Sequence, residues 1–360
     1  MNIRKILKIS LFSLLILIVA IIGFGYWFIG LIRSDIPRED VSQVQFTDLP
    51  YLAEDSTSYR GKILAVVTST AQIGESTKST GYELTELSRA YYVFHANGFE
   101  VDIASPKGGK PPVVIDDDDI GIYDYAFMND PVANHKTQNT IRLEDVAFAD
   151  YSAVYFVGGK GAMFDFPNNL IIQSLVREYY ESDKVIGAVC HGPAALVNVS
   201  LSNGQSLLEN KEVSSFTNEE ELFLIPDAGD LFPFLLQDEL VGKGARFKKG
   251  TMYLKNVVKD GKLITGQNPW STWKLAEEMV EALGYVPKYR PQTSEESAIE
   301  ILLSYENNGY QEAKSQASEM LTSGMAINKE LIAVHSITSV MQGNIGRAIS
   351  LIKLLNFISE

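Results

Sequence analysis

Residues 185–197 read VIGAVCHGPAALV, and this stretch decides the fold of the chain. Its first five residues form an apolar run typical of a buried parallel strand, whereas the residues from Pro193 onward follow a helical pattern. Cys190, His191 and Gly192 lie between the two, and Cys190 is the only cysteine in the sequence. A strand, a nucleophile, a glycine and a helix in this order are typical of a nucleophile elbow, whose tight turn admits only small residues at positions 188 and 192.

Such an elbow predicts a reactive thiol. It would place Cys190 at the carboxyl end of a strand and beside a helix N-terminus, whose partial positive charge favours a thiolate. A thiol also needs a base or a cation to react, and His191 is adjacent to it. The alternative is a buried Cys190 that packs as a small hydrophobic side chain. We therefore expect Cys190 and His191 to be catalytic residues, with a lowered pKa for the thiol.

The composition excludes several classes of protein. The formal net charge of −14 argues against nucleic acid as a partner, because phosphate binding requires a basic surface. A single cysteine excludes an intrachain disulfide and a cysteine-cluster metal site. No two of the four histidines are at the spacing of metal ligands (His95, His135, His191 and His335). We expect neither a metal nor a cofactor.

The first 33 residues predict a membrane anchor. Residues 9–32 carry no charge, and an apolar run of this length spans the core of a bilayer. A cleavable signal peptide is the alternative, but its apolar core would be shorter and would end in small residues, whereas this run carries GYWF at positions 25–28. Arg4, Lys5 and Lys8 place the N-terminus in the cytoplasm, so the sequence predicts a single-pass membrane protein with an extracytoplasmic globular part.

An α/β domain is expected over residues 61–288, after a polar linker at residues 34–60. Its apolar runs predict buried strands that alternate with helices, which is typical of a parallel sheet covered on both faces. The ligand site of such a sheet lies outside the carboxyl ends of its strands. Cys190 and the glycine-rich turn Gly158-Gly159 both follow a strand. The turn would bring backbone N–H groups close to a reacting oxygen.

Residues 289–360 predict an all-α appendage. No strand signal remains beyond Pro291, and four helical stretches are separated by glycines (Gly309, Gly324 and Gly343). Ala313 and Ala348 lie in similar contexts 35 residues apart, which is close to the period of tetratricopeptide-like helical hairpins. A small helical cap and a peptide-binding module are both compatible with this pattern.

Seven motifs follow one another in the order found in a known family. They are TGYELTEL (80–87), HANGFEVDIASPKGGKPP (95–112), DYSAVYFVGGKGAMFDFP (150–167), AVCHGPAAL (188–196), SSFTNEEE (214–221), PFLLQDEL (233–240) and DGKLITGQNPWST (260–272). Through them, residues 62–285 resemble the ThiJ/PfpI family of the class I glutamine-amidotransferase-like superfamily. The most similar branch contains heat-inducible holding chaperones and glutathione-independent glyoxalase III enzymes. The anchor and the tail lie outside the resemblance.

The resemblance implies a flavodoxin-like fold, in which helices sandwich a parallel sheet. It also implies Cys190 as nucleophile, His191 as its partner and Glu221 as the acidic third member. The family's buried glutamate near the thiol corresponds to Glu86. Backbone N–H groups of Gly159 and His191 would form the oxyanion hole.

The sequence departs from this branch at two places. Lys160 stands in the glycine turn where the branch often has histidine, a change that spares a backbone oxyanion hole. The usual P-x-D segment reads PVVI at residues 112–115, a change at the pocket rim.

The leading hypothesis is a cysteine-dependent glyoxalase III-type lyase that converts 2-oxoaldehydes such as methylglyoxal to 2-hydroxy acids without glutathione. The alternatives are a stress-related holding chaperone or redox sensor, and a PfpI-like amide or peptide hydrolase. The expected partners are a small aldehyde substrate and a membrane bound through residues 9–32. A homodimer and a protein partner at the helical tail are also compatible with the sequence.

Overall fold

The chain divides into two compact units. The computed structural model describes residues 18–19, 22–32, 40–53, 58–116 and 119–360. The larger unit comprises residues 40–291, and the smaller one comprises residues 1–39 and 292–360.

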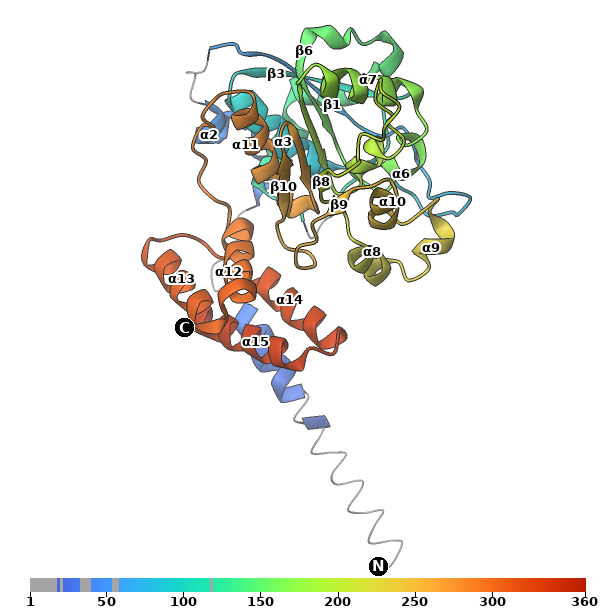
Figure 1. The fold of residues 1–360 in the computed structure, drawn as a ribbon. Helices are drawn as coiled ribbons and strands as arrows, with labels where there is room; N and C mark the ends of the chain where they lie inside the picture. The colour runs from blue at the N-terminus through green and yellow to red at the C-terminus, as the bar shows by residue number, and fades with distance from the viewer. Residues whose placement is uncertain (1–17, 20–21, 33–39, 54–57, 117–118) are drawn as a thin grey trace, which may run out of the picture. The chain divides into compact units, whose positions relative to one another are not determined.

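The larger unit is built on a seven-stranded sheet in the order β10-β11-β7-β6-β1-β3-β5 (Figure 1). Its strands are β1 (Gly61–Val66), β3 (Phe99–Ser105), β5 (Ile141–Arg142), β6 (Tyr151–Phe156), β7 (Val185–Val189), β10 (Val257–Asp260) and β11 (Leu263–Gly266). Neighbouring strands pair in parallel except β10 and β11, which pair antiparallel. Every residue of β7 is buried, as expected for a central parallel strand covered on both faces. The predicted flavodoxin-like sheet is confirmed.

Helices cover both faces of this sheet. Helices α3 (Leu84–Ala96) and α11 (Thr272–Ala282) lie on one face, and α6 (Ala162–Asp165) and α7 (Leu170–Glu181) lie on the other (Figure 1). Helix α7 is amphipathic, and the buried side chains on it recur at helical spacing (Ile172, Leu175, Val176 and Tyr179). The remaining helices of this unit are α2 (Pro50–Ala53), α4 (Ile122–Asn129), α5 (Pro131–Gln138), α8 (Asn218–Leu224), α9 (Ala228–Leu231) and α10 (Leu236–Gly242).

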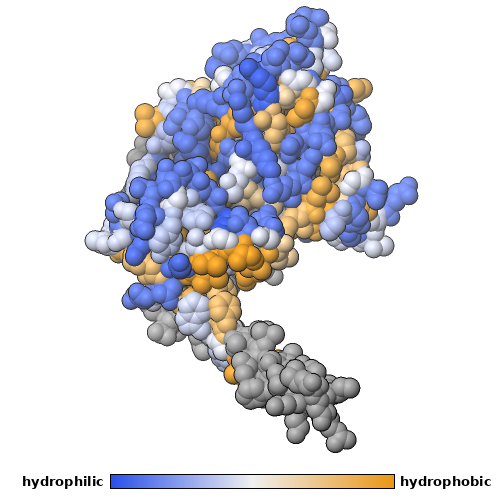
Figure 2. Space-filling view, turned by 60° about the horizontal axis from the view of Figure 1, so that its bottom comes forward, coloured by the Kyte–Doolittle hydropathy of each residue, from blue (hydrophilic) through white to orange (hydrophobic). Residues whose placement is uncertain are grey.

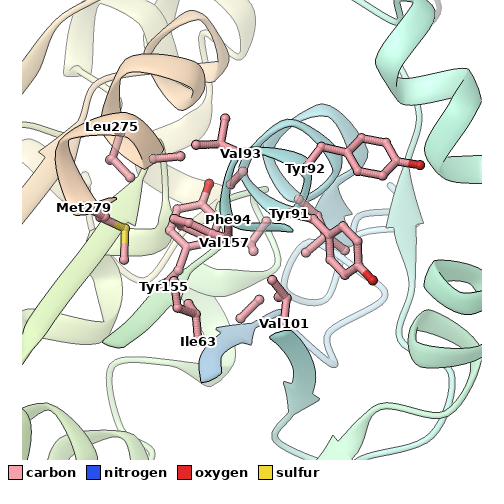
Figure 3. Close-up of a cluster of buried hydrophobic side chains, with 14 of the residues drawn as sticks. Ile63, Tyr91, Tyr92, Val93, Phe94, Val101, Tyr155, Val157, Leu275 and Met279 are labelled. Atoms are coloured by element: carbon pink, nitrogen blue, oxygen red, sulfur yellow. The ribbon is translucent and has the colours of Figure 1, made fainter. Parts of the chain in front are cut away.

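A buried apolar cluster fills the space between the sheet and helices α3 and α11. Figure 3 shows Phe94 of α3 and Met279 of α11 among the side chains that gather around Tyr155 of β6. Helix α11 approaches β7 closely because residue 187 is glycine. A Cβ atom at Gly187 would lie 2.2 Å from Met279 Sδ. A second buried cluster packs under α6 and α7 on the opposite face.

Short elements complete the larger unit. Strand β2 (Tyr82–Glu83) pairs in parallel with β4 (Val113–Val114), and β8 (Glu212–Val213) pairs with β9 (Arg246–Phe247). Ahead of β1, two 3-10 helices, η1 (Val41–Gln43) and η2 (Phe46–Asp48), precede α2, and Leu49 and Tyr51 are buried in the core beside α3. Asn129 fixes this segment, because its side chain donates to the carbonyl oxygens of Ser42 and Val44.

The smaller unit contains four helices after residue 292, as the sequence predicts. They are α12 (Ser294–Asn308), α13 (Tyr310–Thr322), α14 (Lys329–Met341) and α15 (Ile345–Ser359). Gly309 separates the first two with a φ of 85°, a left-handed conformation that glycine adopts without strain. Apolar side chains remain exposed on α14 and α15, and Figure 2 shows hydrophobic surface on this unit (Val334, Ile337, Val340, Met341, Ile345 and Ile349).

The predicted transmembrane helix is wrong. Over the described ranges, no helix is both long enough and apolar enough to cross a bilayer. Residues 9–17 and 20–21 of the expected span lie outside those ranges. The extracytoplasmic location depended on that anchor and is corrected with it.

Candidate active site

Cys190 occupies a left-handed turn at the end of β7. Its φ is 57°, a conformation that a side-chain-bearing residue adopts only where the surroundings hold it. The N–H of Cys190 donates to Gly266 O of β11 at 2.9 Å, and its carbonyl oxygen accepts from Phe216 N at 2.9 Å. The chain then enters the 3-10 helix η5 (Gly192–Leu196). A Cβ atom at Gly192 would lie 2.3 Å from Phe156 O, which explains the small residue expected there.

The glycine turn after β6 brings the Glu86 carboxyl group to the thiol. Gly158 N donates to Glu86 Oε2 at 2.8 Å. A Cβ atom at Gly158 would lie 2.4 Å from that oxygen and 2.8 Å from Cys190 Cβ. Only glycine therefore fits between helix α3 and the elbow. Glu86 itself is fully buried. The sequence alone does not show whether this side of the helix faces the core or the solvent.

His191 links the thiol to Glu221. Cys190 Sγ lies 3.2 Å from His191 Nδ1, and His191 Nε2 lies 2.5 Å from Glu221 Oε2. The imidazole ring is buried and packs against Phe216, with ring centroids 4.8 Å apart. Glu221 lies in α8, which begins after the N-cap residue Thr217. The structure thus joins three of the expected site residues in one chain of contacts and places Glu86 on the other side of the thiol.

Glu86 and Glu221, the two glutamates beside the Cys190–His191 pair, differ in charge. Burial raises the pKa of Glu86 well above its ordinary value, which favours the protonated, uncharged form of this side chain. Burial also acts to raise the pKa of Glu221, but the interaction with His191 outweighs it and lowers the pKa. An ionised Glu221 accepts a hydrogen bond from His191 Nε2–H, which leaves the lone pair of Nδ1 facing the thiol.

The thiol differs from the expectation. Burial raises the pKa of Cys190 well above its ordinary value, and the positive charge of Lys160 opposes this effect without cancelling it. The predicted lowering is therefore wrong. Two features of the structure explain the difference. Cys190 is only 5% exposed, and the helix expected to lower the pKa of the thiol is only the short 3-10 helix η5. A neutral thiol must give its proton to a base as it attacks, and His191 Nδ1 is in position to accept it.

Two backbone N–H groups at the site, those of Gly159 and His191, bear on the expected oxyanion hole. Gly159 has a φ of 97°, and a Cβ atom there would lie 2.4 Å from Gly81 O. Within the described part of the chain, neither Gly159 N nor His191 N donates to a protein acceptor. These are the two groups that the sequence assigns to an oxyanion hole, and both residues are buried.

The sequence assigned no role in the site to three further residues near it, which are Glu83, Lys160 and Glu220. Glu83 and Lys160 interact electrostatically with each other, and burial raises the pKa of Glu83 to about 8. Glu220 accepts five hydrogen bonds and holds α8 in place. The spacing of Glu83 and Glu86 at a helix start is a signal that could have linked that pair, since residues three apart share a face. No cluster of potential metal ligands occurs in residues for which the structure gives positions.

Known proteins share this sequence and fold. Residues 77–221 match the DJ-1/PfpI family. The glutathione-independent glyoxalase HSP31 of Saccharomyces cerevisiae is 31% identical over 235 residues, covering 62% of this chain and 98% of the relative. Two crystal structures also match. Francisella tularensis Rapid Encystment Protein 24 kDa has a TM-score of 0.59 and 38% identity, covering 62% of this chain and 99% of that one. Candida albicans glyoxalase III has a TM-score of 0.56 and 28% identity, covering 62% and 98%.

These similarities extend over nearly the whole length of each relative. The family match over residues 77–221 falls on the larger unit, which carries the elbow and the glycine turn. The chain therefore belongs to the DJ-1/PfpI family.

Proposed function

We propose that this protein is a glutathione-independent glyoxalase that converts small 2-oxoaldehydes, such as methylglyoxal, to 2-hydroxy acids, with Cys190 as the nucleophile. The observation that carries the proposal is the chain of contacts from Cys190 Sγ through His191 to Glu221. The activity of HSP31 and of glyoxalase III, as their names state it, supports the same reaction class.

The first step is addition of the thiol to the aldehyde. Cys190 Sγ forms a bond to the aldehyde carbon, and the thiol proton passes through His191 Nδ1 to the aldehyde oxygen, which gives a hemithioacetal. Glu221 holds the proton on Nε2, so that Nδ1 is the basic nitrogen. Protonated Glu86 supplies a hydrogen-bond donor rather than a second negative charge beside the sulfur.

The second step moves a proton between neighbouring carbons. His191, neutral again, removes the proton from the sulfur-bearing carbon, and an enediol forms between this carbon and the adjacent carbonyl carbon. Return of a proton to the second carbon gives a thioester of the 2-hydroxy acid. The N–H groups of Gly159 and His191 would stabilise the oxygen that gains negative charge.

Water completes the reaction. It adds to the thioester carbon, the carbon–sulfur bond breaks, and the proton returns to Cys190. The balance is one 2-oxoaldehyde and one water to one 2-hydroxy acid, so the proposal requires no external oxidant, reductant or thiol.

The test is lactate formation from methylglyoxal by the purified chain in the absence of glutathione. Cys190→Ser should lower the rate by at least about a thousandfold, because it removes the nucleophile. His191→Gln should also inactivate the protein, whereas the matched change His135→Gln, on helix α5, should not.

Retention of activity by Cys190→Ser would refute the proposal. So would a wild-type protein that forms no lactate but hydrolyses peptides or amides, since that result would identify the same dyad as a hydrolase.

A further inference from the structure

The short segment 216–221 contacts the Cys190–His191 pair at three points. Phe216 N donates to the carbonyl oxygen of Cys190 at 2.9 Å. The ring of Phe216 packs against the imidazole of His191, with ring centroids 4.8 Å apart. At the other end of the segment, Glu221 Oε2 lies 2.5 Å from His191 Nε2. One stretch of chain therefore holds the backbone of the cysteine, the edge of the imidazole ring and its face.

The contact between Phe216 and His191 has the geometry of an aromatic stack. The two ring planes are tilted by 36°, and at 4.8 Å this is close to an offset stack, in which the faces of the rings overlap in part. Both side chains are buried, so solvent does not screen a charge on the imidazole. Phe232 also lies near His191, but its centroid is 6.4 Å away. A cation–π contact requires a separation of no more than about 6 Å, so Phe216 is in range and Phe232 is not.

The imidazole becomes a cation when it accepts the proton of the thiol. The proton then leaves Cys190 Sγ and binds His191 Nδ1, which gives a thiolate beside an imidazolium. The face of a phenylalanine ring carries a negative potential, which attracts a cation more strongly than a neutral ring. Glu221 supplies negative charge at the edge of the imidazole, whereas Phe216 supplies it at the face. The stack therefore stabilises the state after proton transfer relative to the state before it.

We propose that Phe216 is a positioning residue of the thiol site, which acts through His191 and promotes loss of the thiol proton by stabilising the imidazolium with its aromatic face. The effect on the thiol requires only the contacts described above, whereas an effect on turnover rests on the proposed glyoxalase reaction. Ordinary core packing would depend on the shape of the ring and not on its electron density. The two roles are therefore separable by experiment.

The test removes electron density from the ring with little change of its shape. Mono-, di- and trifluorophenylalanine are incorporated at position 216 of the full chain, and each protein is alkylated with iodoacetamide at fixed pH. This reagent forms a sulfur–carbon bond at the thiol with loss of iodide, and Cys190 is the only cysteine. The alkylation rate should fall with each added fluorine, by about tenfold in all, as expected for the loss of a buried cation–π contact.

The matched control is the same fluorine series at Phe127. This residue of α4 is also buried, and it packs against Tyr91 and Tyr92 rather than against His191. Its fluorination should leave the alkylation rate unchanged. Phe216→Leu, which keeps an apolar side chain without a π face, should slow alkylation by about the same tenfold. A constant rate across the series at Phe216, or an equal fall in the series at Phe127, would overturn the inference.

Turnover extends the test to the proposed reaction. The kcat/KM for methylglyoxal should fall in the same order as the alkylation rate across the Phe216 series. A constant kcat/KM would overturn the inference for catalysis. Absence of lactate formation by the wild type would instead refute the glyoxalase proposal, and the alkylation series would still decide the role of Phe216.

Discussion

Glu220 offers the sharpest test of how the site is held together. Its carboxylate is fully buried and accepts hydrogen bonds from five donors. Oε2 accepts from Thr217 N at 2.9 Å and from Thr217 Oγ1 at 2.8 Å. Oε1 accepts from Tyr253 N at 2.8 Å, Gln267 Nε2 at 3.0 Å and Asn268 Nδ2 at 2.9 Å. Glu220→Gln keeps the size of the side chain and removes one acceptor and the charge.

The expected cost follows from these contacts. With the amide oxygen kept at the three-donor position, the amide nitrogen faces Thr217 N, and one buried N–H loses its acceptor at a cost of about 1–3 kcal/mol. The other three bonds lose their charge assistance, at about 0.5–1 kcal/mol each. Glu220→Gln should therefore lower the free energy of unfolding of the larger unit by roughly 2.5–6 kcal/mol. The melting temperature should fall by roughly 5–24 °C.

The assay is urea and thermal unfolding of the full chain, followed by circular dichroism. Glu219→Gln is the matched control, because Glu219 is a neighbour in the same helix that forms only a half-exposed ion pair with Lys249. Such pairs contribute less than about 1 kcal/mol. Since α8 also carries Glu221, Glu220→Gln should lower turnover more than the control does.

A variant that melts within about 2 °C of the wild type would refute the reasoning. It would mean that the five donors find other acceptors and that the carboxylate does not fix α8.

Three further predictions concern packing and protonation. Gly158→Ala should abolish the reaction of Cys190 with alkylating agents, because the new Cβ would lie 2.4 Å from Glu86 Oε2. The control Gly229→Ala has no atom within 4 Å of the new Cβ, so it should change neither stability nor the alkylation rate. The pKa of Glu86 is raised in the folded state, so the wild type should lose stability relative to Glu86→Gln as the pH rises above 4.5. Urea unfolding of both proteins at several pH values measures this difference, and a difference that does not change with pH would contradict the prediction. Burial, with Arg347 second, lowers the pKa of His335 to about 3, so α14 should lose hydrogen-exchange protection as pH falls below 6.5, and His335→Gln should remove that dependence.

The central strands of the sheet were largely predictable from the sequence. Continuous apolar runs mark β1, β6 and β7, because strands covered on both faces leave no alternation, and glycines follow closely after β6 and β7. The same reasoning failed at the N-terminus, where hydropathy alone predicted an anchor from residues 9–32. Apolar length in a sequence does not distinguish a membrane span from other apolar segments, and the described helices do not supply a span.

The site was predictable only in part. Adjacent residues form the Cys190–His191 contact, so local sequence suffices for it. Glu221 lies 30 residues beyond His191 in an acidic run, and only the family resemblance singled it out. The pKa of the thiol depends on how completely other segments bury it, which no local pattern records. For the same reason Glu220 went unnoticed, because three of its five donors come from residues 253–268.

The hydrogen bond from Cys190 N to Gly266 O has a consequence for synthesis of the chain. The left-handed turn at Cys190 is held by a strand that the ribosome makes about seventy residues later, so the elbow cannot close while residue 266 is still inside the ribosome. Until then the sulfur is an ordinary accessible thiol on an unfinished sheet, open to oxidants. The newborn chain is therefore more vulnerable to oxidation at this atom than the mature protein, and slow translation between residues 190 and 266 would lengthen that exposure.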